Sequence, residues 1–243
     1  MEPPAISLLI PAYNEEALLP GVLARVHTSF AAIGFAAYEV VVCDNHSTDA
    51  TADVARAGGA RVVYEEHNQI SRARNTAARG ALGKWLIFLD GDTLLSPELL
   101  AETIRCFESG VVCAGGASLQ FDLADIGPFA ANMTRVWNGI STRFGLAAGS
   151  YLYCYRQAWE EVDGIDETVY AGEELFFSHR LKRWAKARGL RFRILTDTPV
   201  ITSARKVGWY GQWGLLWRCL LLMRPGAMRS RAACSLWYSR PPA

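Results

Sequence analysis

The sequence predicts an α/β fold with a mostly parallel central sheet flanked by helices. Short runs of β-branched and other apolar residues alternate with amphipathic stretches through the first half of the chain, which is typical of strands wrapped by helices. At 243 residues, of which 51% are hydrophobic, the chain can bury a full core. The charged fraction of 20% argues against a disordered chain, and the net charge of +1 offers no global field that would attract nucleic acid.

Four strands are expected in the first half. They are placed at residues 6–10, 38–43, 61–64 and 85–89. Three helices are expected between them: one at residues 15–30, one that ends at about residue 57 and one that begins at residue 71. Ser47, Thr48 and Asp49 are expected to cap the second helix, because such side chains accept hydrogen bonds from the free amides of a first turn.

The pattern is less regular in the second half. Helices are expected at residues 97–107, 125–144 and 173–188, and short strands at residues 111–114, 151–155 and 192–195. Gly115, Gly116 and Gly149 interrupt the apolar runs.

Polar clusters follow three of the expected strands, at residues 11–14, 44–47 and 90–92. Ligands of open parallel sheets bind beyond the carboxyl ends of the strands. We therefore expect these clusters to converge on one site.

The most informative cluster is Asp90, Gly91 and Asp92, directly after an apolar strand. Two carboxylates one residue apart suit a hard divalent cation shared with a diphosphate, and the glycine lets the backbone approach a ligand. Mg²⁺ or Mn²⁺ there would neutralise the charge that builds on a leaving nucleoside diphosphate. An ordinary turn explains the same residues, since Asp-Gly is a frequent turn pair.

The other two clusters also admit two interpretations. Residues 11–15 suit a base or ribose held against backbone groups and a carboxylate, or a plain strand-to-helix turn. Residues 44–49 offer side chains that can hydrogen-bond a pyrimidine or ribose, and they also suit helix capping.

Together these segments resemble family 2 of the inverting glycosyltransferases, which have a nucleotide-binding GT-A fold. The matching segments lie in the family's order at residues 10–15, 44–51, 73–75 and 88–92, and the resemblance covers about residues 5–200. It implies a GT-A-like fold, the transfer of a sugar from a UDP- or GDP-sugar to an acceptor hydroxyl, and Mg²⁺ or Mn²⁺ held by Asp92. The donor-binding residues that it implies are Pro11, Ala12, Tyr13, Glu15, Asp44, Asn45, Arg74, Asp90 and Gly91.

Such a transfer needs a carboxylate base, because the acceptor hydroxyl loses its proton as it attacks the anomeric carbon. Bases of this family follow a glycine-rich segment and open a helix, as Glu173 and Glu174 do here. Glu174 is preferred because it stands at the second position of the family's acidic pair. Both residues would also complement the positive end of a helix dipole without a catalytic role.

Three departures from the family pattern affect these expectations. The usual Asp-Asp-Gly-Ser run reads Asp-Asn-His-Ser at residues 44–47, and the usual Glu-Asp pair is Glu-Glu. A histidine that helps hold the metal in many relatives has no counterpart at residues 199–206. That leaves Asp92, the diphosphate and water as metal ligands, or Arg205 and Lys206 as direct phosphate contacts.

The C-terminal tail combines aromatic and basic residues with an apolar run, and no acidic residue follows Asp197. This composition suits a helix at an anionic membrane surface or a flap over a lipid-linked acceptor, and equally a helix packed on the core or a dimer contact. The run at residues 213–223 is too short to span a bilayer, and the first residues do not resemble a signal peptide. We expect a cytoplasmic protein in peripheral contact with the inner membrane surface.

These features divide the chain into a glycosyltransferase domain at residues 1–205 and a tail at residues 206–243. The nucleotide-binding half would occupy about residues 1–115 and the acceptor half about residues 116–205. Two rivals stay open: a nucleotidyltransferase, which shares the metal and diphosphate chemistry but attacks phosphorus, and a catalytically degenerate protein that binds a nucleotide sugar.

Overall fold

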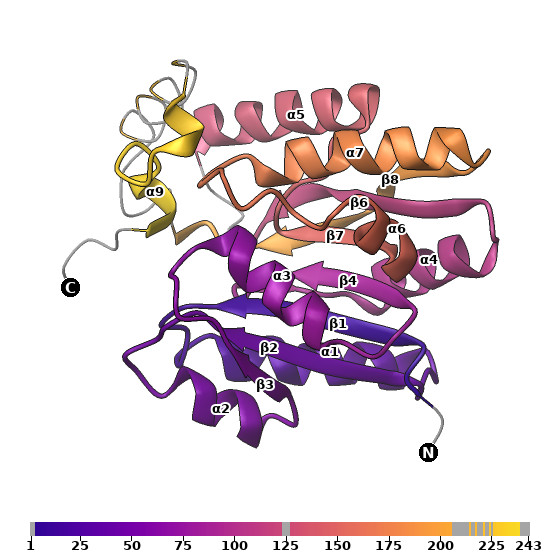
Figure 1. Cartoon of the computed structure of the whole chain (residues 1–243), viewed down its shortest axis with the longest axis horizontal. Helices are drawn as coiled ribbons and strands as arrows, with labels where there is room; N and C mark the ends of the chain where they lie inside the picture. The colour runs from indigo at the N-terminus through magenta and orange to yellow at the C-terminus, as the bar shows by residue number, and fades with distance from the viewer. Residues whose placement is uncertain are drawn as a thin grey trace.

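Figure 1 shows the computed structural model of the chain, an eight-stranded sheet covered by helices. It describes residues 3–122, 127–205 and 226–238, and the single residues 214, 217, 221 and 224. The strands are β1 (Ile6–Ala12), β2 (Tyr38–Asp44), β3 (Arg61–Tyr64), β4 (Trp85–Leu89), β5 (Thr93–Leu94), β6 (Val112–Phe121), β7 (Tyr151–Tyr155) and β8 (Arg191–Thr202). The helices are α1 (Leu19–Ala32), α2 (Thr51–Ala57), α3 (Ile70–Gly80), α4 (Pro97–Glu108), α5 (Gly127–Phe144), α6 (Arg156–Glu161), α7 (Glu173–Ala187), the 3-10 turn η1 (Ala227–Arg229) and α9 (Ser235–Tyr238).

Most of the sheet is parallel, as the sequence predicted. The strands lie in the order β3-β2-β1-β4-β7-β6-β8-β5, and β1 pairs in parallel with both β2 and β4. β7 runs antiparallel to β4 and β6, and β5 runs antiparallel to β8. β2 and β4 lie on opposite sides of β1. The loops after β1 and β4 therefore diverge and form a topological switch point, where open sheets bind ligands.

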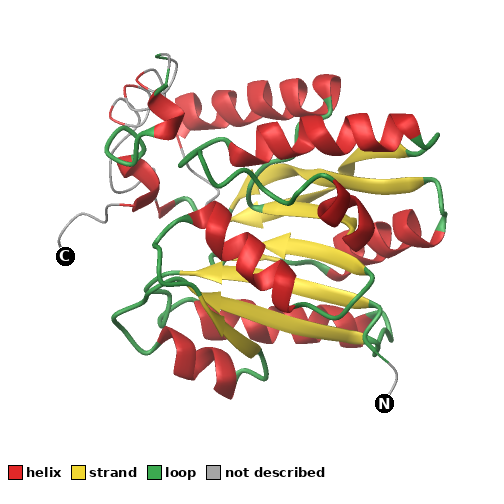
Figure 2. Ribbon diagram, viewed as in Figure 1, coloured by secondary structure: helices red, strands yellow, loops and turns green. Residues whose placement is uncertain are grey.

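Alternate side chains of the strands build a core on each face of the sheet. On one face Ile6 and Leu8 pack in a cluster with buried residues of α1 and α4. On the other face Leu9 and Val41 pack with buried residues of α3, α6 and α7, and Figure 2 shows α3 crossing in front of the strands. Both faces of the central strands are therefore buried, which explains their nearly continuous apolar sequence.

The central strands agree closely with the sequence analysis. The runs at residues 61–64, 85–89 and 151–155 are β3, β4 and β7, while β1 and β2 extend to Ala12 and Asp44. α2 begins only at Thr51, after Ala50, which provides no side-chain cap. The expected capping by Ser47 and Thr48 is therefore wrong, although Asp49 Oδ1 accepts a hydrogen bond from the Thr51 amide at 3.0 Å.

The later strands are longer than the sequence indicated. β6 continues through Gly115 and Gly116, which the sequence analysis treated as an interruption. A Cβ atom on Gly115 would lie 1.8 Å from the Arg193 carbonyl oxygen, and one on Gly116 would lie 2.6 Å from Ala147 Cβ. Glycine is required at both positions because neighbouring atoms leave no room for a side chain. The two glycines do not break the strand. β5 and α6 were not anticipated.

The part of the chain that the structure describes contains no helix both long enough and apolar enough to cross a membrane.

Candidate functional site

The loops after β1 and β2 are bound to each other at the carboxyl edge of the sheet. The Asn45 amide donates to the Ala12 carbonyl oxygen at 2.8 Å, and the Asn14 amide donates to Ser47 Oγ at 3.0 Å. The Thr48 amide in turn donates to Asn14 Oδ1 at 2.8 Å. Asn14 adopts a left-handed backbone with a φ of 52°, which turns the chain sharply after β1. Two of the three predicted clusters thus form one rim.

Of the expected donor-binding residues in this rim, Asp44 and Asn45 make hydrogen bonds that hold the loops. Asp44 is buried at the end of β2 and accepts a hydrogen bond from the Ser47 amide at 3.0 Å. Asn45 is committed to the fold, because its side-chain amide donates to the His67 carbonyl at 2.6 Å and its Oδ1 accepts from the Gln69 amide at 2.9 Å. Pro11 lies in register with Cys43 in the β1–β2 pairing, Ala12 is buried, and Tyr13 is half-buried.

Arg74 lies at the centre of the site. Its Nη2 atom donates to Asp90 Oδ1 at 2.7 Å and to the Gly149 carbonyl oxygen at 2.8 Å, while Nη1 donates to Glu173 Oε1 at 2.7 Å. Burial disfavours its charge, but Asp90 and Glu173 more than compensate and hold the pKa of Arg74 above its ordinary value. One guanidinium therefore joins the loop after β4 to the start of α7.

α7 presents the two candidate bases in its first turn. Gly172, with a φ of 71°, precedes the helix, and Glu173 is buried and held by Arg74. The half-buried Glu174 has its pKa raised to about 8, first by burial and then by the negative charge of Glu173. A Cβ atom placed on Gly149 would lie 3.7 Å from Glu174 Cδ, so the Glu174 carboxyl faces the bend before β7. Of the two, Glu174 has the pKa suited to accept a proton near neutral pH.

A second ion-paired cluster surrounds Asp92. Arg205, just beyond β8, donates from Nη1 and Nη2 to the two carboxylate oxygens of Glu15, at 2.8 and 2.6 Å. The same Nη2 atom lies 3.0 Å from Asp92 Oδ2. Gly91 packs beneath them, since a Cβ on it would lie 3.5 Å from both Glu15 Cγ and the Pro11 carbonyl oxygen.

The two arginine clusters bring four carboxylates and two guanidiniums close together. The carboxylates belong to Glu15, Asp90, Asp92 and Glu173. Within the described residues no group of three or more His, Cys, Asp or Glu side chains could hold a metal ion. Oxygen atoms of a bound ligand could join Asp92 in holding a hard cation here.

Comparison with known proteins identifies the family. A model described as glycosyl transferase family 2 matches residues 7–133, which is more than half of the chain. The chain belongs to glycosyltransferase family 2. A validoxylamine A glucosyltransferase of Streptomyces hygroscopicus subsp. jinggangensis is 37% identical over 110 residues, which make up 42% of this chain and 25% of that relative. The putative glycosyltransferase EpsH of Bacillus subtilis is 26% identical over 110 residues, 43% of this chain and 31% of that protein. The matched stretch therefore spans about a quarter to a third of these relatives.

Solved structures extend the likeness over the whole fold. The mannosyltransferase PcManGT of Pyrobaculum calidifontis, in complex with GDP-Man and Mn²⁺, superposes with a TM-score of 0.67 at 21% identity, covering 97% of this chain and 70% of that one. S. aureus TarS in complex with UDP gives a TM-score of 0.63 at 18% identity, covering 97% of this chain and 71% of that one. The predicted GT-A-like α/β fold is confirmed.

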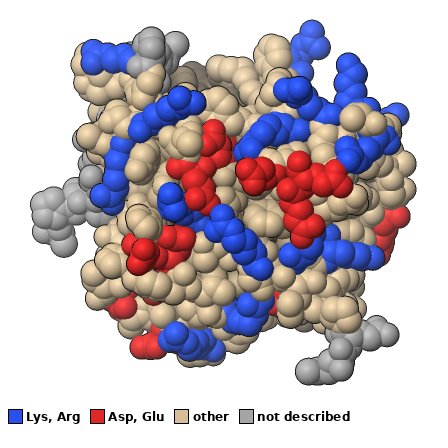
Figure 3. Space-filling model, in the orientation of Figure 1, with Lys and Arg blue, Asp and Glu red and all other residues tan. Residues whose placement is uncertain are grey.

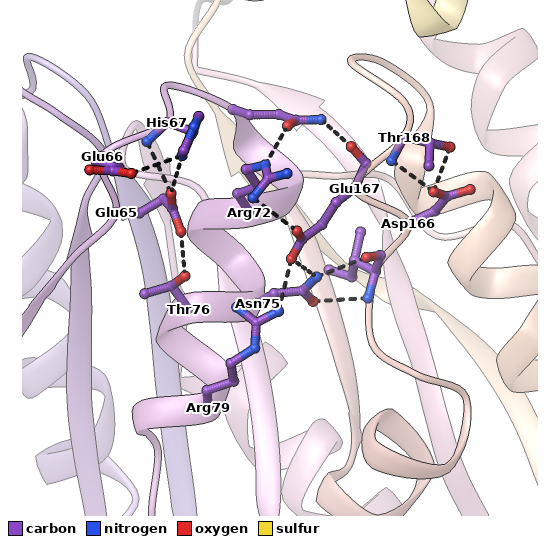
Figure 4. Close-up of polar contacts among 12 residues, drawn as sticks. Glu65, Glu66, His67, Arg72, Asn75, Thr76, Arg79, Asp166, Glu167 and Thr168 are labelled. Atoms are coloured by element: carbon purple, nitrogen blue, oxygen red, sulfur yellow. Dashed lines mark hydrogen bonds and ion pairs between the residues drawn. The ribbon is translucent and has the colours of Figure 1, made fainter.

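The loop that leads to Glu173 is held by residues that the sequence analysis did not single out. Figure 4 shows Asn75 and Glu167 at the centre of this network. Asn75 Nδ2 donates to the Ile165 carbonyl at 2.8 Å and to Glu167 Oε1 at 2.9 Å, and its Oδ1 accepts from the Ile165 amide at 2.9 Å. Gln69 Nε2 donates to the Glu167 carbonyl oxygen at 2.8 Å. The position of Asn75 beside Arg74 in the family motif was the only signal for this role.

The C-terminal segment of the chain also reaches the site. The Tyr238 hydroxyl accepts from the Ile70 amide at 3.3 Å, and the Tyr170 amide donates to the Met228 carbonyl at 2.7 Å. Burial, and next the charge of Glu173, raises the pKa of Tyr238. Residues 226–238 therefore pack against the start of α3 and the loop before α7, while most of residues 206–225, including Lys206, lie outside the described residues.

Proposed function

We propose that this glycosyltransferase moves a sugar from a UDP- or GDP-sugar to an acceptor hydroxyl with inversion, and that Glu174 is the base. The observation that carries the proposal is the position of Glu174. Its carboxyl, with a pKa raised to about 8, lies beside Gly149, whose carbonyl accepts from the same arginine that holds Asp90. A proton acceptor thus adjoins the acidic motif that would hold the donor.

The donor would lie along the rim formed by the loops after β1, β2 and β4. Pro11, Ala12, Tyr13 and Asp44 border the nucleoside side, and Asp90 and Asp92 border the diphosphate side. Solved structures with the same fold are complexes with GDP-Man, UDP and UDP-GlcNAc, which supports a nucleoside diphosphate sugar here. Asn45 would contribute by holding the rim in place, because its side chain is bonded to the loop before α3.

Asp92 would hold Mg²⁺ or Mn²⁺ through its carboxylate, and the ion would neutralise the charge on the departing diphosphate. The carboxylates beside Arg74 and Arg205 support this role, since a cation between a carboxylate and a diphosphate reduces the repulsion between them. Two structures of similar fold contain Mn²⁺ together with a nucleotide or nucleotide sugar.

Inversion in one step requires the base and the leaving group on opposite sides of the anomeric carbon. Glu174 would take the acceptor proton, while Arg74 holds the neighbouring Glu173 in place through a hydrogen bond. The negative charge of Glu173 and the partial burial of Glu174 make Glu174 a stronger base than a solvated carboxylate.

Thermal unfolding in the presence of nucleotides tests the donor site. UDP, GDP and their sugar conjugates would be added with Mn²⁺, with Mg²⁺ or with a chelator, because a ligand of the native state at a hundred times its Kd stabilises the fold by about 2.7 kcal/mol. We expect a metal-dependent shift that Asp92→Asn abolishes and that Asp197→Asn, an exposed aspartate on β8, leaves intact. A chain that no nucleotide stabilises under any metal condition is not a transferase of this kind.

A transfer assay separates a catalyst from a binding protein. Glu174→Gln should abolish sugar transfer and donor hydrolysis while nucleotide binding stays within about threefold of the wild type, since the base touches the acceptor and not the nucleotide. Equal transfer rates in the variant and the wild type would remove Glu174 from the mechanism. Binding without transfer in the wild type would favour a degenerate nucleotide-sugar binding protein.

We further propose a lipid-linked acceptor delivered at an anionic membrane surface. Exposed apolar side chains repeat along one face of α5, flanked by the exposed Arg135 and Arg143. Lys182 of α7 donates to the carbonyl of the last α5 residue at 2.6 Å, so the end of α5 lies against α7. The apolar residues are Met133, Val136, Ile140 and Phe144, exposed by 46%, 55%, 40% and 62%.

Vesicle sedimentation tests this surface. The protein should bind vesicles that contain phosphatidylglycerol, and Val136→Glu combined with Ile140→Glu should weaken binding at least tenfold, whereas Thr142→Glu on the same helix should change it by less than threefold. Equal loss in both variants would mean that charge alone, and not the apolar face, governs binding.

A further inference from the structure

Arg205 forms an ion pair with Asp92, the residue whose carboxylate is proposed to hold the metal. Its Nη2 atom is 3.0 Å from Asp92 Oδ2 and also donates to Glu15 Oε1 at 2.6 Å, while Nη1 donates to Glu15 Oε2 at 2.8 Å. The three side chains are largely buried, with exposed fractions of 20% for Arg205, 11% for Asp92 and 9% for Glu15. They come from three segments far apart in the sequence: the loop after β1, the loop after β4 and the residues just beyond β8.

A guanidinium competes with a divalent cation for the same carboxylate oxygen. Mg²⁺ and Mn²⁺ approach a carboxylate oxygen to about 2.0–2.2 Å, so that a cation on Asp92 Oδ2 would lie close to the positive charge of Arg205. Arg205 is paired with that oxygen, and its charge therefore opposes a cation there.

A diphosphate would relieve this conflict. Its oxygens suit the planar fork of a guanidinium, which binds phosphate through paired hydrogen bonds. Arg205 also makes two hydrogen bonds to Glu15, and these do not involve Asp92. A small movement of Nη2 from Asp92 to a phosphate oxygen would therefore leave Arg205 anchored and would free Asp92 for the cation.

We propose that Arg205 couples metal binding to donor binding. In the free protein it blocks the metal position at Asp92, and the diphosphate of the donor draws it away, so that the metal and the nucleotide bind together. Glu15 is the positioning residue that keeps Arg205 within reach of both. This inference rests on the proposed function, because it assumes a nucleoside diphosphate at this rim.

The affinity of the nucleotide-free protein for Mn²⁺ tests the blocking role. Electron paramagnetic resonance measures it, because the signal reports the concentration of the unbound ion. Arg205→Gln should bind Mn²⁺ at least tenfold more tightly than the wild type, because it removes the positive charge that competes with the ion for Asp92; tenfold corresponds to about 1.4 kcal/mol. The same variant should bind UDP or GDP at least tenfold more weakly in the presence of a chelator. A residue that merely supports the fold would not change the two affinities in opposite directions.

The controls separate charge competition from damage to the fold. Arg193→Gln removes a partly exposed arginine of β8 that pairs with Glu102 of α4, and both affinities should stay within about twofold of the wild type. Arg205→Lys keeps the charge but loses the fork, so its Mn²⁺ affinity should fall between those of the wild type and Arg205→Gln. Thermal unfolding of each variant verifies that it is folded. If Arg205→Gln does not fold, the comparison of Arg205→Lys with the wild type replaces it as the test.

Coupling gives a second, independent measure. In the wild type, nucleotide should raise the Mn²⁺ affinity and Mn²⁺ should raise the nucleotide affinity by the same factor, and Arg205→Gln should reduce that factor at least tenfold. Mn²⁺ affinity that is unchanged or weaker in folded Arg205→Gln would overturn the inference, even if the wild type binds nucleotide with metal. If the wild type binds no nucleotide, the proposed function fails, and the Mn²⁺ comparison on the free protein still decides whether Arg205 blocks Asp92.

Discussion

Replacing Glu174 by glutamine should stabilise the fold at alkaline pH while it abolishes transfer. The pKa of Glu174 is raised from 4.5 to about 8, first because the side chain is partly buried and then because Glu173 is negatively charged. Between these two pH values the folded protein binds a proton that the unfolded chain releases. The free energy of unfolding therefore contains a contribution that is complete below pH 4.5 and is lost as the pH rises to about 8.

The size of this contribution follows from the two pKa values. At about 1.4 kcal/mol for each pH unit, the interval from 4.5 to about 8 gives an upper limit of about 5 kcal/mol. Solvent reaches part of the Glu174 side chain, and we therefore expect about 2 kcal/mol. Glutamine stays neutral at every pH, so the advantage of Glu174→Gln over the wild type should grow by about this amount between pH 5 and pH 9.

Urea denaturation at pH 5, 7 and 9 measures the difference. Glu160→Gln is the matched control, because Glu160 is an exposed glutamate of the neighbouring helix α6 whose removal should shift the unfolding free energy by less than about 0.5 kcal/mol at any pH. An advantage of Glu174→Gln that does not grow with pH would refute the raised pKa, and with it the reason for choosing Glu174 as the base.

The transfer rate of the wild type should follow the same ionisation. Only the deprotonated form of Glu174 can accept a proton, and kcat/KM should rise about tenfold for each pH unit below about 8 and level off above it. A rate that is flat between pH 5 and pH 8 would exclude Glu174 as the base.

Two further predictions concern stability. Arg74→Gln leaves Asp90 and Glu173 without their shared buried partner and should lower the free energy of unfolding by about 3–5 kcal/mol in chemical denaturation, whereas Arg79→Gln, which removes a 59% exposed arginine, should cost less than about 1 kcal/mol. Gly172→Ala should cost about 1–2 kcal/mol in the same assay, because its φ is 71° and the new Cβ would lie 3.3 Å from Met228 Sδ.

Each prediction has a result that contradicts it. Equal losses in Arg74→Gln and Arg79→Gln would mean that the buried ion pairs contribute no more than a surface pair. For the glycine, Gly21→Ala in α1 is the comparison, since nothing lies within 4 Å of its new Cβ and helix propensity should make it stabilising by about 0.5–1 kcal/mol. A Gly172→Ala variant as stable as Gly21→Ala would show that the turn before α7 tolerates a side chain.

The family motifs and the central strands could be predicted from the sequence because both are local. β3, β4 and β7 are short apolar runs whose residue types favour strands, and the polar residues after β1, β2 and β4 follow directly from where those strands end. The order of the motifs was enough to indicate the family, which the match at residues 7–133 confirms.

The long strands β6 and β8 could not be predicted in full. Glycine weakens a strand by its intrinsic preference, and Gly115 and Gly116 were therefore interpreted as an end. Only the folded chain shows that the Arg193 backbone and Tyr153 approach too closely for any side chain at Gly115.

The sequence by itself determined the fold class, the family and the set of polar residues at the carboxyl edge of the sheet. It favoured Glu174 over Glu173 only through the position of Glu174 in the family motif, because the two are adjacent and chemically alike. The tertiary structure made them different: Arg74 reaches Glu173 from α3, while burial and the charge of Glu173 raise the pKa of Glu174. The same holds for Arg205 and Asp92, which are 113 residues apart in number and 3.0 Å apart in space. Charges interact through distance and burial, and only the folded chain sets those two quantities.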